Sequence, residues 1–245
     1  MLIANGKSAQ GNKAVGRIID RMDFVVRFNY FKIRGSAAAA ALGSRTDLWF
    51  LSEMKRPAAR EFDKTIHPRQ YVIPVAIPAR LGCSKKALKK CTVLPAERRA
   101  WNTRGRRLKN LYCGKLKLRP DSFRVVPLEV LETLRQKYGF FSMWPSTGLL
   151  GILYVLHSYP DAKVYLHGYD FTRAKKSDCP EEAVRRREGK ASARTYICRS
   201  SALGHFWETH KKSGTVHNMF AEGEVIRRLS KDGKIAVLKA TSPTS

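Results

Sequence analysis

Short apolar segments rich in β-branched and aromatic residues recur along the chain, and helix-length stretches separate them. The opening MLIANGKS is expected to be a buried strand that enters a turn, with a helix over 14–20 and further strands at 24–28 and 48–52. A strand, a helix and another strand at this spacing form the βαβ unit of a parallel sheet. We therefore expect an α/β fold, in which one Rossmann-like domain over 1–240 has a mostly parallel twisted sheet flanked by helices, followed by a tail at 241–245.

The rest of the chain continues this alternation. Helices are expected over 128–138, 149–157 and 216–229, and strands at 71–77, 162–166 and 234–238. Proline cannot donate to a sheet, so Pro74 marks either the end of its strand or an edge strand. Residues 37–41, all alanine, form a short helix or the flank of a loop, and the polar stretch 173–195 forms a mobile loop or an exposed helix.

The balance of charge is strongly positive. Lysine and arginine number 47 against 20 acidic residues, which gives a formal net charge of +27. Such a surface attracts anions, and on charge alone nucleic acid is the first candidate, ahead of a membrane face or an acidic small molecule. Much of the excess lies in a basic segment at 82–119, which we expect to serve an anionic acceptor or a membrane surface.

The five cysteines do not form a metal-binding pattern, because their number is odd and no CxxC pair occurs. We expect free thiols in a reducing compartment. No apolar run approaches the roughly 18 residues of a membrane-spanning helix, and no secretory signal precedes the first strand. The expected location is cytoplasmic, with at most a peripheral contact to a membrane.

The residues Pro145-Ser146-Thr147-Gly148 stand directly before the apolar segment 149–157. Ser146 or Thr147 can cap the expected helix, and the free amides of its first turn can bind an anion such as a nucleotide phosphate. The alternative is an ordinary N-cap before a core helix.

Two asparagines stand at the ends of expected strands, Asn5 before Gly6 and Asn29 between aromatic residues. Parallel sheets bind ligands at the carboxyl ends of their strands, and an asparagine side chain both donates and accepts hydrogen bonds. The alternative is a turn-forming asparagine, which fits Asn5 better than Asn29.

Histidine is the side chain best suited to general-base work near neutral pH, and the chain has six. His205 begins the sequence His-Phe-Trp-Glu, and His217 precedes Glu222 by five positions. His167 stays open between a structural and a functional role. The histidines interpreted as core or surface residues are His67, His157 and His210.

Taken in order, these stretches resemble the sialylmotifs of the eukaryotic-type sialyltransferases, glycosyltransferase family 29. The long motif matches residues 3–46, including Val25-Val26-Arg27-Phe28-Asn29 and Gly43-Ser44-Arg45-Thr46. The short motif matches 144–171, and the third and very short motifs match 204–222. Order and spacing carry the resemblance, which is thinnest between residues 53 and 140.

The resemblance implies a GT-A-like variant of the α/β fold and an inverting, metal-independent enzyme. This enzyme transfers sialic acid from CMP-sialic acid to an acceptor hydroxyl of a glycan or glycolipid. His217 is then the general base and His205 contacts the departing phosphate, while Glu222 orients a histidine or caps its own helix. The donor-binding residues implied are Asn5, Gly6, Asn29, Trp144, Ser146, Thr147, Gly148 and Gly168. No metal or other cofactor is implied, and no nucleic-acid partner.

Three alternatives stay open: a CMP-Kdo-dependent transferase of the same fold, a basic nucleic-acid-binding protein, and an inactive family member that binds without transferring. The chain also departs from the family pattern. The usual disulfide is missing, because residues 1–4 contain no cysteine and Tyr159-Pro160-Asp161 fills the other position. Trp144 stands where tyrosine is usual. Asp20 and Asp23 are interpreted as structural, which leaves no acidic pair to hold a metal.

Overall fold

The computed structural model describes most of the chain. The described residues are 1–10, 15–29, 31, 33, 36–51, 66, 68–75, 95–140, 145–173, 181–183, 194–196 and 219–238. Trp144, His205 and His217 lie outside these ranges, so the roles implied for them stay predictions.

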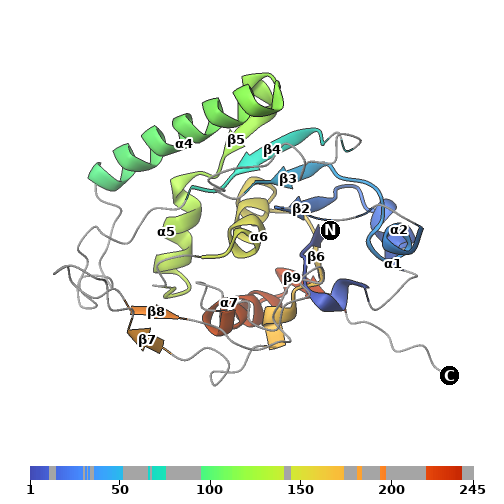
Figure 1. The fold of residues 1–245 in the computed structure, drawn as a ribbon. Helices are drawn as coiled ribbons and strands as arrows, with labels where there is room; N and C mark the ends of the chain where they lie inside the picture. The colour runs from blue at the N-terminus through green and yellow to red at the C-terminus, as the bar shows by residue number, and fades with distance from the viewer. Residues whose placement is uncertain are drawn as a thin grey trace.

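A seven-stranded sheet forms the centre of the fold, in the order β5-β4-β3-β2-β1-β6-β9, and every neighbouring pair is parallel (Figure 1). Its strands are β1 (Leu2–Ile3), β2 (Val26–Phe28), β3 (Leu48–Phe50), β4 (Gln70–Ile73), β5 (Phe123–Val125), β6 (Val164–His167) and β9 (Ile235–Val237). The central strands β1, β2 and β3 are buried at every position, as expected of parallel strands covered on both faces. The expected α/β fold with a parallel sheet is confirmed.

Helices cover both faces of this sheet. They are α1 (Val15–Asp20), α2 (Ser36–Leu42), α4 (Pro95–Leu116), α5 (Leu128–Gln136), α6 (Thr147–Ser158) and α7 (Met219–Lys231), with single 3₁₀ turns η1 (Lys7–Gln10), η2 (Pro120–Ser122) and η3 (Asp170–Arg173). Successive residues of a strand face opposite sides. Ile3 accordingly packs with the side chains of α1 and α2, whereas Leu2 belongs to the larger cluster that contains the side chains of α5, α6 and α7.

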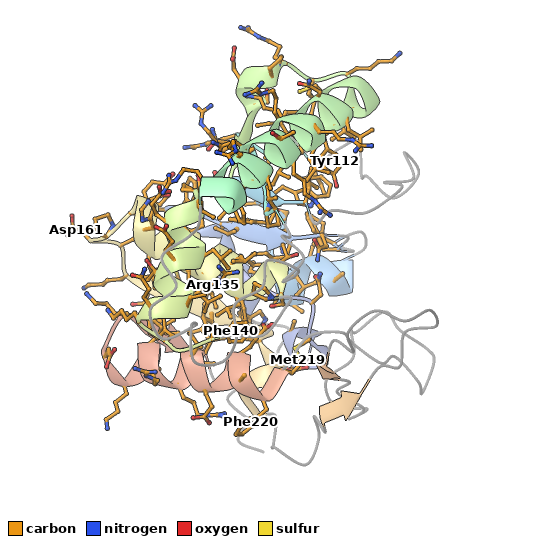
Figure 2. The ribbon with its side chains drawn as sticks, turned by 90° about the vertical axis from the view of Figure 1, so that its left-hand side faces the viewer. Tyr112, Arg135, Phe140, Asp161, Met219 and Phe220 are labelled. Carbon is orange, nitrogen blue, oxygen red and sulfur yellow. The ribbon has the colours of Figure 1, made fainter. Side chains whose placement is uncertain are left out.

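An aromatic row on three adjacent strands anchors α4. Trp49, Tyr71 and Phe123 are paired in register, with ring centroids 5.9 Å and 5.0 Å apart. Tyr112 of α4, labelled in Figure 2, stacks on Phe123 at 6.3 Å. The row therefore continues from the sheet into the helix, which lies along this side of the sheet in Figure 1.

In three regions the structure either differs from the sequence-based expectation or decides between its alternatives. β4 pairs on both sides and ends at Ile73, so Pro74 marks the end of a strand and not an edge. Neither α4 nor β5 was predicted. A mobile loop or an exposed helix was expected over 173–195, which is wrong for the described residues 181–183 and 194–195, because β7 (Glu181–Ala183) and β8 (Arg194–Tyr196) form an antiparallel pair.

Two further expectations can be compared with the described residues. Cys113 on α4 is a free thiol. Across the described ranges, no helix combines the length and the apolar character needed to cross a bilayer.

Candidate active site

The order of the strands reverses at β1. From β1 the chain adds β2 to β5 on one side of the sheet and then returns to place β6 and β9 on the other side. Open α/β sheets bind ligands in the crevice beyond the carboxyl ends of the strands at such a reversal. Asn5 and Gly6 follow β1 and Gly168 follows β6, so three of the predicted donor-binding residues meet at this position.

The two glycines allow the loops after β1 and β6 to touch. Gly6 donates its N–H to the carbonyl of Gly168 at 3.0 Å. A Cβ on Gly6 would lie 2.7 Å from the carboxylate of Asp170 and closer still to the carbonyl oxygen of Gly168. Gly168 itself has φ +73°. Both positions therefore require glycine, one for close approach and the other for backbone conformation.

The two asparagines fix the ends of β1 and β2. The Asn5 side chain is buried and donates from Nδ2 to the carbonyl of Phe28 at 2.9 Å. Asn29 has φ +51°, donates its backbone N–H to Phe50 O at 2.7 Å and accepts from Trp49 Nε1 at 2.7 Å. The turn-forming role thus belongs to Asn29 and not to Asn5, the reverse of the expectation.

Ser146 is the N-cap of α6. Its hydroxyl oxygen accepts the N–H of Leu149 at 3.1 Å, which confirms the capping role expected from the sequence. Within the described part of the chain, the backbone N–H groups of Thr147 and Gly148 have no hydrogen-bond partner. These two amides, at the positive end of the helix dipole, are the groups of this turn that can hold an anion.

Glu222 lies in the first turn of α7 and is completely buried. Its carboxylate accepts the backbone N–H of Ser146 at 2.7 Å and also accepts the Ser146 hydroxyl proton. Glu222 thus joins α7 to the N-cap of α6, and the single hydroxyl proton of Ser146 is already engaged. That Glu222 orients a histidine or caps its own helix stays a prediction, because His205 and His217 lie outside the described residues.

Tyr169 and Phe28 fill the space between these loops. The Phe28 ring lies against Gly151 of α6, where a Cβ would clash with the ring, and meets Tyr169 edge-on at 6.2 Å. Burial raises the pKa of the Tyr169 phenol well above its ordinary value, and the charge of Glu222 raises it further. No specific function was expected from the sequence for Tyr169, Phe28 or Gly151, although Phe28 lies in the stretch that resembles the long motif and Tyr169 in the one that resembles the short motif.

His167 has a structural role. It is buried at the end of β6, and its Nε2 lies 3.0 Å from the carbonyl of Ala9. Burial lowers the pKa of its imidazole below the ordinary value. A neutral ring that donates from Nε2 therefore holds η1 against β6.

Two residues of the long motif serve the framework. Arg27 is buried on β2, and its guanidinium donates to the carbonyls of Leu42 and Gly43 at the end of α2, at 2.7 Å and 3.0 Å. Asp20 accepts the backbone N–H groups of Ser44 and Arg45 at 2.9 Å. The structural interpretation of Asp20 is confirmed. In the ranges that the structure covers, no group of three or more His, Cys, Asp or Glu side chains is placed to hold a metal ion.

Comparison with known proteins gives a likeness in structure only. No family model matches the sequence, and no curated protein matches it. The similar solved structures include a mammalian sialyltransferase, and a mammalian sialyltransferase in complex with Gal-β-1-3GalNAc-ortho-nitrophenol. Each is 17% identical with a TM-score of 0.52, and the match covers 98% of this chain and 68% of the other. At this identity the similarity shows that the chain shares their fold.

Proposed function

We propose that this chain is a glycosyltransferase that transfers sialic acid from CMP-sialic acid to a hydroxyl of a glycan or glycolipid. One observation carries the proposal: the bond between Ser146 and Glu222, which are 76 positions apart. Ser146 belongs to the stretch that resembles the short motif and Glu222 to the stretch that resembles the very short motif. Two motifs recognised separately in the sequence thus meet in space, on a fold shared with sialyltransferases.

The proposed donor position lies between α6 and the ends of β1 and β2. The N–H groups of Thr147 and Gly148 would hold the phosphate of CMP, because they point out of the positive end of α6. Ser146, whose hydroxyl proton is bound by Glu222, would position this turn and not itself donate to the phosphate. Asn5 and Asn29 would shape the loops beside the nucleotide.

The proposed reaction is an inverting displacement. His217 would take the proton from the acceptor hydroxyl, whose oxygen attacks the anomeric carbon of the sugar as the bond to phosphate breaks. CMP departs with the bonding electron pair, and His205 would donate to its phosphate as negative charge develops there. In this scheme the histidine, the helix end and the surrounding basic residues supply positive charge, and no divalent cation takes part.

CMP-Kdo is the second candidate donor, because the amides of α6 would bind the CMP phosphate that both donors share. The acceptor is proposed to be a glycan or glycolipid. A related fold has been crystallised with a Gal-β-1-3GalNAc glycoside, which makes this disaccharide a reasonable first acceptor.

The test is to incubate the protein with CMP-sialic acid and with CMP-Kdo, each with and without Gal-β-1-3GalNAc. CMP release and the mass of the glycan product would be followed. Acceptor-dependent release of CMP with a product heavier by one sugar supports the proposal and identifies the donor. A folded protein that binds neither donor nor CMP would contradict it.

A further inference from the structure

Asp170 is a buried carboxylate at the strand reversal that the proposed mechanism does not use. It follows β6 at the start of η3 and is only 8% exposed. Its Oδ2 accepts the backbone N–H of Ser8 at 3.1 Å, and the same carboxylate lies against Gly6. Asp170 therefore sits between the loops after β1 and β6, beside the predicted donor-binding residues Gly6 and Gly168.

The second carboxylate oxygen, Oδ1, is buried and has no hydrogen-bond partner within the described part of the chain. Burying a carboxylate oxygen without a donor is costly, and folded proteins rarely leave such a group unpaired. The position at the reversal of strand order is where open α/β sheets hold their ligands. Both observations indicate a donor that comes from a bound molecule.

We propose that Asp170 Oδ1 accepts a hydrogen bond from the nucleoside part of the donor nucleotide; this inference rests on the proposed function. A carboxylate only accepts hydrogen bonds, and it repels the phosphate and the carboxylate of CMP-sialic acid. The nucleoside offers two kinds of donor, the hydroxyls of ribose and the 4-amino group of cytosine. Asp170 thus contributes to nucleotide selectivity, while the amides of α6 hold the phosphate.

Binding of four nucleotides measures this contact. Dissociation constants would be determined by calorimetry for CMP, 2′-deoxy-CMP, 3′-deoxy-CMP and UMP, which lacks the amino group. The wild-type protein should prefer CMP over at least one of the other three by about 10- to 100-fold, the range for a hydrogen bond to a charged group. In Asp170→Ala that preference should fall to about twofold or less, because the acceptor is gone.

Comparing the four nucleotides within one variant separates the loss of the proposed hydrogen bond from a general loosening of the loop after β1. Loss of the hydrogen bond between Ser8 and Asp170 should weaken the binding of all four nucleotides alike. Asp161→Asn is the matched control: Asp161 is exposed (Figure 2), and its variant should keep the wild-type preferences. If Asp170→Ala does not fold, Asp170→Asn takes its place, and its preference should fall to a few-fold because a neutral acceptor is roughly half as strong.

Unchanged preferences in a folded Asp170 variant would overturn the inference, and Oδ1 would then be satisfied by water or by another part of the chain. A wild-type protein that binds all four nucleotides equally would overturn it as well. A protein that binds no CMP would fail at the proposed function itself, and this result is distinct from CMP binding without selectivity.

Discussion

At the scale of single residues, Ser146 and Glu222 define the candidate site more sharply than any other pair. Ser146 gives its backbone N–H and its hydroxyl proton to one buried carboxylate, and its oxygen caps α6. The pair thereby fixes the first turn of α6 relative to α7. We infer that both residues position the amides proposed to bind phosphate and do not themselves touch the donor.

Glu222→Gln tests this positioning role. The amide can accept only one of the two hydrogen bonds from Ser146, so the free energy of unfolding should fall by about 1.5–3 kcal/mol, the range for hydrogen bonds to charged groups. CMP affinity should also weaken, whereas a substitution at a purely structural residue far from the site would leave it unchanged. Ser146→Ala combined with Glu222→Gln should cost less than the sum of the single changes. Glu224→Gln is the control on the same helix, because Glu224 is half-exposed and its variant should lose less than about 0.5 kcal/mol.

Thr147→Pro tests the backbone amide directly. Thr147 is the first residue of α6, a position where proline is tolerated because its N–H has no partner in the helix. Ser146 has φ −65° and ψ 155°, the extended conformation that a following proline requires. The variant should keep the wild-type melting temperature and weaken CMP binding by about 10- to 100-fold. Thr147→Val removes only the hydroxyl, and an equal loss in that variant would assign the contact to the side chain.

The predicted roles of His217 and His205 can be separated by kinetics. His217→Ala should lower kcat by about 10²–10⁴, the usual contribution of a positioned base, and leave CMP binding intact. The acidic limb of the pH profile of kcat/KM should disappear in this variant. His205→Ala should weaken CMP binding and also slow transfer, because its bond strengthens as charge develops on the leaving phosphate. A His217→Ala protein with near-normal kcat would remove the general base from the mechanism.

At the scale of secondary structure, the strands near the amino terminus were predictable and α4 was not. Residues 24–28 and 48–52 are rich in β-branched, aromatic or other apolar residues and follow an aspartate, so the sequence itself indicates strands there. On α4 the buried residues Trp101, Leu108 and Tyr112 do recur at helical spacing. Charged residues separate them, so the sequence shows a strongly basic stretch there and does not predict the helix.

The candidate site shows the same division. Gly6 and the cap at Ser146 have local signatures, a turn glycine and a hydroxyl residue before an apolar helix. The partner of Glu222 lies 76 positions away, and no local pattern encodes such a pairing. Asp170 gave no signal either, because a single aspartate between two aromatic residues is common in turns and only the packing of β1 against β6 buries it.

The outer face of α4 contains exposed arginines with which the expected role of the basic segment 82–119 can be tested. Arg98 pairs with Glu129 at 3.2 Å and Glu132 at 3.6 Å, whereas Arg99, Arg106 and Arg107 are exposed and have no carboxylate partner among the described residues. The structure thus separates Arg98 from the arginines available to an anionic acceptor or a membrane.

Reversing Arg99, Arg106 and Arg107 to glutamate should raise the KM for an anionic acceptor and weaken binding to phosphatidylserine vesicles by roughly 100-fold or more, at about 1 kcal/mol for each basic residue lost. CMP affinity should stay within about twofold, because α4 packs on β4 and β5 at one edge of the sheet, whereas the strand order reverses at β1. Reversal of the exposed Arg21, Lys231 and Lys234 changes the net charge equally and serves as the control. Equal damage to CMP binding would place α4 in the donor site, and salt-sensitive duplex DNA binding without CMP binding would favour the nucleic-acid alternative.

At the scale of the whole molecule, a chain with a net charge of +27 is proposed to bind an anionic ligand. The long-range field of the surface charges is screened beyond about 10 Å at 0.1 M salt. Hydrogen bonds from the half-buried first turn of α6 are less sensitive to salt. Salt should therefore change the capture of the donor by the field, whereas the local amides act on CMP affinity and on the chemical step at any salt concentration.

This division leads to a prediction about metal and salt. If protein groups supply the positive charge that stabilises the departing CMP, EDTA should leave kcat and KM within about twofold of their values without it. Raising the salt concentration from about 0.05 M to 0.5 M should raise the KM for the donor several-fold, because screening removes the attraction of the basic surface, while kcat changes little. Both series can be followed by CMP release at fixed acceptor concentration. Loss of activity in EDTA that manganese or magnesium restores would contradict the metal-independent mechanism. A kcat that falls with salt at constant KM would show instead that surface charge acts on the chemical step or on product release.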